Sequence, residues 1–141
     1  MSLAETRAFF DAYRAAFNRL DGDAVADLWH AQSGIADSRD GVSRVTWWSD
    51  DAPMRANHRA LCEVYRHNGY DHADFLIEQH QALGPNHAFA RLQWALRRAD
   101  GSLLQAFHTG YQLLRMAGGL RVLLAIAYEE DLQEMTHHAA Q

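Results

Sequence analysis

The chain has 141 residues, of which 48% are hydrophobic and 22% charged, and its formal net charge is −5. This length and balance indicate one folded domain over residues 1–141. The negative charge argues against a nucleic-acid partner, because phosphate binding needs a basic surface. All 13 basic residues are arginines, which excludes a Schiff-base lysine and the lysine of a phosphate-binding loop.

Cysteine content and hydropathy indicate which kinds of site and which cellular location to expect. Cys62 is the only cysteine, which excludes an intrachain disulfide and a cysteine-rich zinc site. No apolar run approaches the roughly 20 residues of a membrane-spanning helix, so we expect no membrane partner. The first residues lack the basic and apolar segments of a secretory signal. We therefore expect a cytoplasmic protein.

The N-terminal segment predicts two helices. Residues 3–20 carry apolar side chains at spacings of three and four, which is typical of an amphipathic helix. Val25, Leu28 and Trp29 then form the apolar stripe of a second, short helix, which Asp23 is placed to cap.

A hairpin and a third helix are predicted next. Strand character appears at 34–37, and Asp40–Gly41 predicts a turn into a second strand at 42–48. Residues 53–68 form the third predicted helix, with an acidic cap and a proline in the first turn, and Gly69 ends it.

The C-terminal half changes to a period of two. Turn signals separate four predicted strands at 72–83, 87–98, 102–116 and 120–129. Helices followed by long hairpins indicate an α+β domain, in which helices fill the hollow of a strongly curved antiparallel or mixed sheet around an apolar pocket. Residues 122–128 are apolar on both faces, so we expect a second subunit to cover the outer face, giving a homodimer through the sheet.

This order of elements resembles the SnoaL-like, nuclear-transport-factor-2-like superfamily. The residues that carry the resemblance are Tyr13-Arg14-Ala15-Ala16-Phe17-Asn18, Gly22-Asp23-Ala24, Leu28-Trp29 and the hairpin from Gly110-Tyr111-Gln112-Leu113-Leu114 to Gly119-Leu120-Arg121-Val122. The resemblance implies a cone-shaped sheet wrapped around N-terminal helices. Members include steroid isomerases, polyketide cyclases, dehydratases, epoxide hydrolases and non-catalytic binding domains, so the fold implies a pocket and leaves the reaction open.

The ketosteroid isomerase branch of that superfamily can be compared residue by residue. Its first helix carries a tyrosine that donates a hydrogen bond to the substrate oxygen, and an aspartate at the end of its first strand is the general base. Tyr13 and Asp37 match these two positions. The second acid of that branch would fall at Thr109 or His108, neither of which is a carboxylic acid, and the segment 38–51 is longer here.

Tyr13 and Asp37 also make chemical sense as a pair. Burial disfavours the ionised form of a carboxylate and makes it a better proton acceptor, and a phenol can stabilise a developing oxyanion. We therefore expect an isomerase-like or cyclase-like acid–base enzyme that acts on an apolar carbonyl compound. In the simpler interpretation Tyr13 is a core aromatic and Asp37 a turn residue.

Two other functions stay open at this point. The missing second acid favours a non-catalytic ligand-binding or dimerisation module of the same fold. Water activation, as in the dehydratase and epoxide hydrolase branches, is the other alternative.

The expected ligand is a small apolar molecule, because large aromatic side chains bind flat apolar ligands well. The candidate pocket walls are Trp48, Trp94, Phe107 and Tyr111. His108 alternates with Phe107 and Thr109, so only one of the two sets can face the pocket. The register of Tyr111 favours Thr109 inward and His108 outward; with the opposite parity, His108 would be a hydrogen-bond donor or base.

The histidines do not predict a metal site. Four residues share one parity on the third strand, which we interpret as a solvated or dimer-edge stripe: His72, Asp74, Glu78 and His80. His58 and Cys62 lie one helical turn apart, and we interpret them as core residues. No cofactor is expected, because proton transfer needs only positioned acids and bases.

Overall fold

The computed structural model describes residues 1–131, and residues 132–141 of the predicted domain lie outside this range. The helices are α1 (Leu3–Asn18), α2 (Gly22–Ala26) and α3 (Asp51–His67). The strands are β1 (Trp29–Arg39), β2 (Val42–Trp48), β3 (Tyr70–Leu83), β4 (His87–Arg98), β5 (Leu103–Met116) and β6 (Gly119–Asp131). Among these helices none is both long and apolar enough to cross a membrane.

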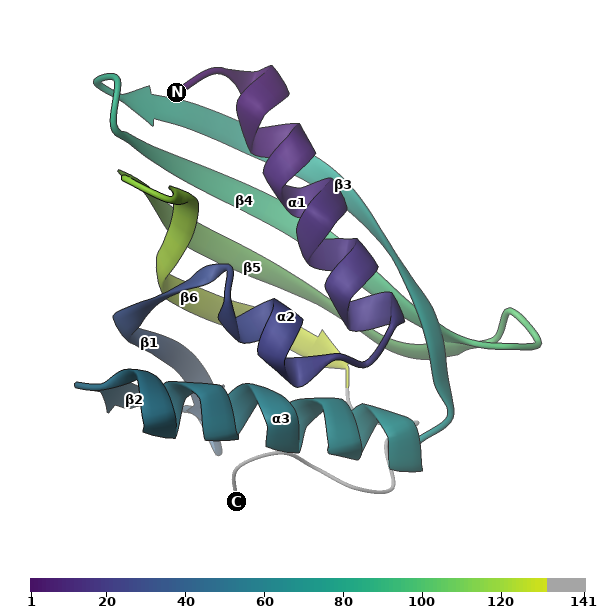
Figure 1. Cartoon of the computed structure of the whole chain (residues 1–141). Coiled ribbons are helices and arrows are strands. Elements are labelled where there is room, and N and C mark those ends of the chain that lie inside the picture. Colours follow the sequence, from purple (N-terminus) through teal and green to yellow (C-terminus); the bar gives the residue numbers. More distant parts are fainter. Residues whose placement is uncertain (132–141) are drawn as a thin grey trace.

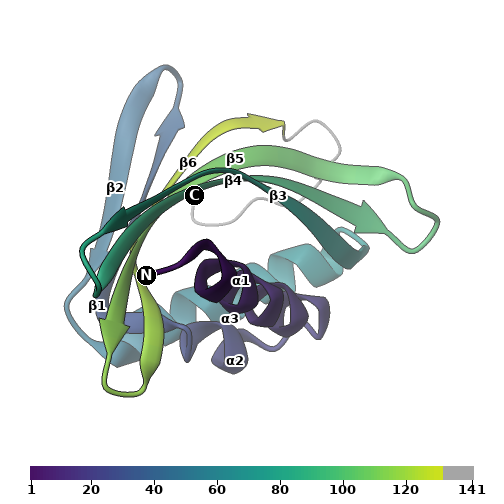
Figure 2. The same ribbon diagram turned by 90° about the horizontal axis from the view of Figure 1, so that it is seen from above.

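The strands form one mixed sheet with the order β2-β1-β6-β5-β4-β3. Neighbouring strands are antiparallel except β1 and β6, which are parallel. The sheet arches over the helices, which fill its hollow (Figure 1, Figure 2). Register shifts in β3, β4, β5 and β6 contribute to this curvature, because a bulge bends its strand and increases the local twist. The predicted α+β fold is confirmed.

Helix α1 begins with a capping box and places an aromatic stripe against the sheet. Ser2 Oγ accepts a hydrogen bond from the Glu5 N–H, and the Glu5 carboxylate accepts one from the Ser2 N–H. Phe10 contacts Tyr111 of β5, with ring centroids 4.8 Å apart. The buried residues of the helix are Thr6, Phe9, Phe10, Tyr13, Ala16 and Phe17.

Two local expectations for α2 were wrong. Asp21, not Asp23, caps the helix, since its carboxylate accepts a hydrogen bond from the Ala24 N–H at 3.0 Å. The helix ends at Ala26, and Trp29 is the first residue of β1, where it pairs with Val122. A short helical stripe cannot be distinguished from the start of a strand by periodicity alone.

A bulge in β3 divides the polar stripe that was expected to lie on one face. The register shifts between Ile77 and Gln79. As a result, Glu78 contacts His108 on the outer face, whereas the His80 ring contacts Thr6 of α1 at 3.0 Å. One extra residue in a strand exchanges the faces of all that follow it.

The inner face of the sheet combines large and very small side chains. Ala88, Ala90 and Leu92 of β4 are completely buried, and Trp94 on the same face is nearly so. Ala125 and Ala127 of β6 also face inward. The sequence left this parity open, and the inward placement of small residues leaves space between the sheet and the helices.

The contact between α2 and α3 depends on Gly22. A Cβ atom at this position would lie 2.6 Å from the Arg59 Cα atom and 2.8 Å from its backbone nitrogen. We therefore predict that Gly22→Ala lowers the free energy of unfolding by about 1–3 kcal/mol in urea denaturation, because backbone atoms cannot move aside as a flexible side chain can.

Gly118→Ala is the matched control, since its Cβ atom would meet only the end of the Arg121 side chain, at 3.1 Å. Equal stability of the two variants would contradict this account of helix packing.

Candidate functional site

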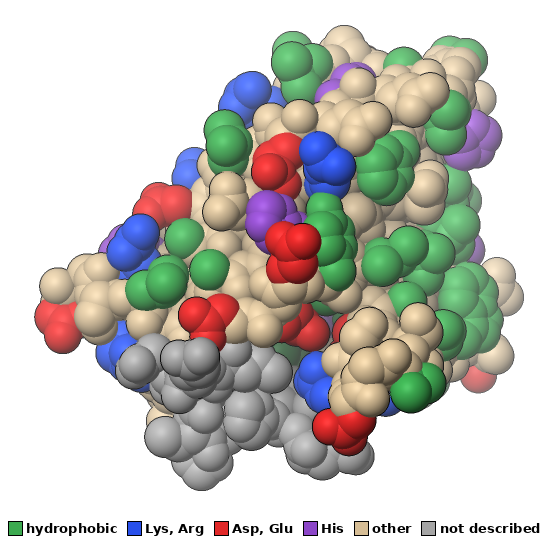
Figure 3. Space-filling model, turned by 180° about the vertical axis from the view of Figure 1, so that it is seen from behind, with side chains coloured by type: hydrophobic (Ala, Val, Ile, Leu, Met, Phe, Trp, Pro, Cys, Tyr) green, Lys and Arg blue, Asp and Glu red, His purple; other side chains and the backbone are tan. Residues whose placement is uncertain are grey.

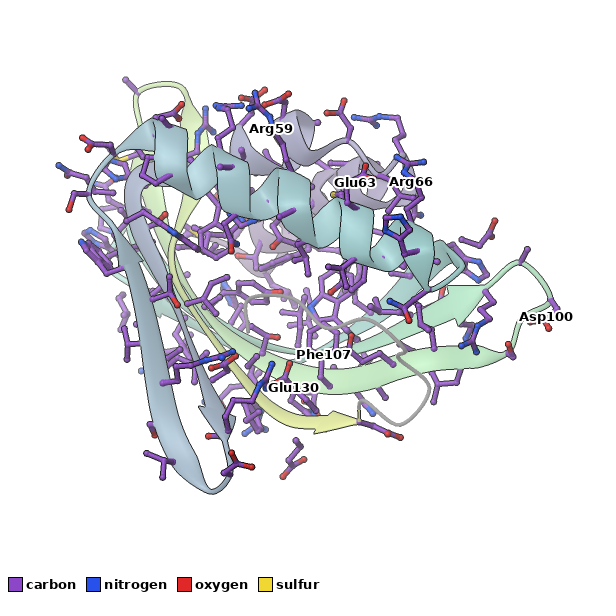
Figure 4. All side chains as sticks on the ribbon, turned by 90° about the horizontal axis from the view of Figure 1, so that it is seen from below. Arg59, Glu63, Arg66, Asp100, Phe107 and Glu130 are labelled. Carbon is purple, nitrogen blue, oxygen red and sulfur yellow. The ribbon has the colours of Figure 1, made fainter. Side chains whose placement is uncertain are left out.

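A cavity of about 160 Å³ lies between the concave face of the sheet, α1 and α3. Phe107 of β5 and Glu130 of β6 lie on its sheet side, whereas Arg59, Glu63 and Arg66 lie on the outward side of α3 (Figure 4). Most of the lining is aromatic or aliphatic. The lining residues with polar groups include Tyr13, Asp37, Arg39, Arg44, Asn57, His58, Tyr111 and Glu130.

Two buried tyrosine hydroxyls form one polar end of the cavity. Trp29 Nε1 donates a hydrogen bond to Tyr13 Oη at 3.3 Å, and Trp94 Nε1 donates one to Tyr111 Oη at 2.9 Å. The two tyrosine rings are 6.0 Å apart. Because an indole nitrogen can only donate, each hydroxyl accepts a hydrogen bond from a tryptophan, and the two hydroxyls also form a hydrogen bond with each other.

Both hydroxyls stay protonated at physiological pH. Burial, reinforced by the neighbouring Tyr111, raises the pKa of Tyr13 well above its ordinary 10. Burial also raises the pKa of Tyr111 to about 12, although hydrogen bonds from Trp94 and other neighbours oppose the shift. The pair can therefore donate hydrogen bonds to an oxygen atom of a ligand.

A second polar group is built on the β1–β2 hairpin. Asp37 pairs across the strands with Arg44, which donates hydrogen bonds of 3.0 and 2.9 Å to the two carboxylate oxygens. Arg39 lies 3.8 Å from the same carboxylate and 3.4 Å from Glu130. The side chains of Asp37 and Glu130 are only 14% and 18% exposed.

Arginine side chains hold both carboxylates at this end of the cavity. An ionised carboxylate offers about four lone-pair sites, so the two hydrogen bonds from Arg44 leave part of Asp37 available. Burial raises the pKa of Glu130, an effect that Arg39 opposes and the nearby Asp37 reinforces. This end of the cavity therefore holds two candidate bases beside two fixed guanidinium groups.

His58 of α3 is a third polar group on the wall. It is 1% exposed, and its ring lies 4.6 Å from that of Trp29 and 5.7 Å from that of Trp48. Burial, with a smaller contribution from the positive charge of Arg55, lowers its pKa to about 3. The imidazole is therefore neutral at physiological pH.

Most of the residues predicted from sequence meet at this one cavity. Tyr13 and Asp37 line it together. All four candidate walls also line it: Trp48, Trp94, Phe107 and Tyr111. Thr109 is buried and shares the face of Tyr111, but it is not among the lining residues.

His108 faces outward, as the register of Tyr111 predicted, so the alternative in which it binds the ligand is wrong. Strand alternation places it on the outer face, where Nδ1 lies 2.7 Å from Glu78 and Nε2 lies 3.3 Å from Glu129. Its ring stacks on Tyr128 at 5.3 Å. His108 does not reach the cavity, and Tyr111 supplies the hydroxyl that stands near Tyr13 instead.

Three residues of the site were missed or misjudged from sequence. Arg44 could have been found, because the Asp40–Gly41 turn sets the register that pairs it with Asp37. Glu130 lies beyond the predicted end of the last strand, so no pattern signalled it. His58 was interpreted as core, which its burial confirms, but its place on the cavity wall needed the packing of α3.

The arrangement gives no indication of a metal centre within residues 1–131. No group of three or more His, Cys, Asp or Glu side chains in this range is placed to hold a metal ion. His58 and Cys62 are both buried on α3.

The family model described as NTF2-like protein (DUF6841) matches residues 4–130. The chain belongs to this NTF2-like family. No curated protein resembles it in sequence at a significant level.

Solved structures agree with an NTF2-like fold for the chain. A domain of unknown function with a cystatin-like fold from Nostoc punctiforme PCC 73102 has a TM-score of 0.69 at 13% identity, covering 95% of this chain and 82% of its own. A ketosteroid isomerase-like protein from Erwinia carotovora atroseptica has a TM-score of 0.62 at 18% identity, covering 89% and 93%.

A third solved structure also has a fold similar to that of this chain. It is described as a candidate calcium/calmodulin-dependent protein kinase type II association domain from Thiobacillus denitrificans. Its TM-score is 0.66 at 18% identity, over 86% of this chain and 91% of its own. At these identities the comparisons establish the fold alone.

His58 should make the stability of this NTF2-like chain depend on pH. Its pKa is about 3 in the folded chain against an ordinary 6.5, so the unfolded chain binds more protons between these values. The free energy of unfolding should therefore fall as the pH is lowered through this window, by up to about 1.4 kcal/mol per pH unit. His58→Leu removes this contribution.

Urea denaturation of wild type and variant at about pH 6.5 and about pH 4.5 measures the difference. The exposed His87 provides the control, because His87→Leu should leave the pH dependence unchanged. An identical loss of stability in wild type and His58→Leu would contradict the buried, neutral state of His58.

Proposed function

We propose that this protein is a cofactor-independent acid–base enzyme that acts on a small, largely apolar carbonyl compound. Asp37 removes a proton from the carbon next to the carbonyl group. The electron pair of that C–H bond forms a C=C bond, and the π pair of the C=O bond moves to the carbonyl oxygen, where the hydroxyls of Tyr13 and Tyr111 stabilise the enolate. In a β,γ-unsaturated substrate, the carboxyl group of Asp37 then returns the proton to the γ carbon as the enolate re-forms the carbonyl group, and the C=C bond ends in conjugation with it.

The observation that carries this proposal is the shared cavity of Tyr13 and Asp37. Had the Asp37 side chain faced solvent, the two groups could not act on one ligand. Tyr111 stands beside Tyr13, and its hydroxyl group is protonated. It can therefore take the role of the second oxyanion donor, for which the sequence comparison offered only Thr109 or His108. Glu130 is a second candidate base at the same end of the cavity.

The size of the cavity limits the substrate. An apolar cavity of about 150 Å³ in another protein accommodates benzene, and the cavity here is about 160 Å³. The volume of this partly open cavity therefore fits a single substituted ring. We propose a monocyclic ketone or aldehyde as the substrate class, smaller than the steroids of the related isomerase branch.

A specific observation favours the second candidate function, a non-catalytic ligand-binding module. Arg44 binds both carboxylate oxygens of Asp37 and holds them in place. If this pair serves only to close the cavity, a ligand would bind between the aromatic walls without reacting. The two functions differ in turnover and not in binding.

Isomerisation of cyclohex-3-en-1-one to its conjugated isomer, followed by ultraviolet absorbance, tests the enzyme proposal. We expect wild type to accelerate the reaction. Tyr13→Phe should lower the rate by about 10²–10³, the usual effect of removing one oxyanion donor. Asp37→Asn should abolish the acceleration, because the amide cannot accept the proton.

Tyr65→Phe is the matched control, since it removes another hydroxyl from the cavity lining without touching the Tyr13–Tyr111 pair. Circular dichroism of each variant excludes loss of the fold. Binding of the ketone to wild type without any turnover would leave the non-catalytic module as the function.

We also propose that two copies of the chain associate through the outer face of the sheet. Hydrophobic side chains gather along one side of this face (Figure 3). Among the exposed apolar residues, Trp47 of β2 is 53% exposed and Ile126 of β6 is 43% exposed. Gly34 leaves room for the Trp47 ring, which would lie 2.7 Å from a Cβ atom at that position. One of the similar structures is described as a candidate kinase association domain, which supports association of chains with this fold.

Ile126→Glu should convert the homodimer to a monomer in sedimentation velocity, because a buried unpaired charge is unfavourable in an apolar interface. Leu3→Glu is the control, since Leu3 is 46% exposed on α1, away from the sheet face. A wild-type chain that sediments as a monomer at high micromolar concentration would contradict the proposal.

A further inference from the structure

His58 is a buried polar side chain for which the described residues supply no hydrogen-bond partner. Neither Nδ1 nor Nε2 has one within residues 1–131, although both atoms are shielded from solvent. A neutral imidazole carries one N–H donor and one acceptor nitrogen. Leaving such buried groups unpaired costs about 1–3 kcal/mol each.

Packing alone does not account for a histidine at this position. The other buried residues of α3 are Met54, Cys62 and Tyr65, and an aliphatic side chain of similar volume would fill the same space. The ring packs against Trp29 and Trp48 and is part of the wall of the cavity. A ligand in this cavity is therefore placed to bring a partner to the unpaired imidazole.

The indole of Trp29 contacts both His58 and Tyr13, one of the two tyrosines proposed to stabilise the enolate. Its Nε1 atom donates to the Tyr13 hydroxyl at 3.3 Å, and its ring is 4.6 Å from the His58 ring. Tyr13 and His58 therefore contact the same indole, and both line the cavity. Two polar points on one small molecule can be recognised at the same time.

The charges around the cavity identify the kind of group that His58 can bind. Arg39 and Arg44 already hold the carboxylates of Glu130 and Asp37, and His58 itself is neutral. Arg55, the cation whose charge acts on His58, is bound by three aspartates, Asp23, Asp27 and Asp51. Among the described residues, the cations near His58 are therefore already paired and do not compensate a ligand carboxylate or phosphate. A neutral hydroxyl group, which can donate to one nitrogen of the ring, fits the site.

We propose that the natural ligand of the cavity is a monocyclic hydroxy ketone or hydroxy aldehyde whose hydroxyl group forms a hydrogen bond with His58. This inference rests on the proposed function for the placement of the carbonyl oxygen at Tyr13. It adds a second point of recognition, on α3, to those on α1 and the sheet. His58 positions the ligand and takes no part in the proton transfer.

Isothermal titration calorimetry with acetophenone and its 2-, 3- and 4-hydroxy isomers tests the proposal. At least one hydroxy isomer should bind wild type about 5- to 100-fold more tightly than acetophenone does, because it relieves an unpaired buried group. His58→Leu should bind acetophenone at least as well as wild type and lose the preference for the hydroxy isomer. His58→Gln, which keeps a donor and an acceptor, should recover part of it.

Tyr13→Phe separates this inference from the proposed function. It should weaken the binding of acetophenone and of its hydroxy isomers by the same factor, so the preference for the hydroxy isomer stays intact. A preference that survives in His58→Leu, or equal binding of all four compounds to wild type, would overturn the role of His58. So would failure of every compound to bind at millimolar concentration. Absence of turnover together with a His58-dependent preference would instead count against the enzyme proposal alone.

Discussion

The fold depends on a hollow that the sheet does not fill with its own side chains. Ala73, Ala125 and Ala127 face this space, while the aromatic stripe of α1 and the buried face of α3 hold the helices away from the strands. Bulged strands curve around the helices, so the enclosed volume stays within a continuous hydrophobic core. In a closely packed interior such a space is uncommon unless it serves a ligand.

Polar groups are placed at the wall of this hollow in three different ways. Tyr13 and Tyr111 each accept a hydrogen bond from a tryptophan N–H, and their protonated hydroxyls also form a hydrogen bond with each other. Asp37 is oriented by its cross-strand arginine, whereas His58 has no partner within residues 1–131. In the proposed reaction, the hydrogen-bonded tyrosines stabilise charge and Asp37 transfers the proton. We infer that a ligand supplies the hydrogen-bond partner that His58 lacks within residues 1–131.

Sequence patterns predicted the architecture well because period and turn chemistry act locally. The strands at 42–48 and 87–98 were predicted with the bounds that the structure has. Errors arose where the signal was short or depended on tertiary structure: Trp29 begins a strand that pairs with distant β6, and a bulge moves His80 to the inner face. Within the site, Tyr13 and Asp37 were found through their spacing. Glu130 and the ligand-facing role of His58 depend on long-range packing that no local pattern encodes.

The central claim is that one cavity binds a carbonyl oxygen between two tyrosine hydroxyls with a carboxylate beside the neighbouring carbon. A crystal structure of the protein with a substituted phenol, whose phenolate form imitates an enolate, tests this most directly. The account predicts that the phenol oxygen lies within hydrogen-bond distance of both Tyr13 Oη and Tyr111 Oη, with Asp37 next to the ring. A phenol whose oxygen points to Arg44, or a cavity that excludes the ring, would contradict it.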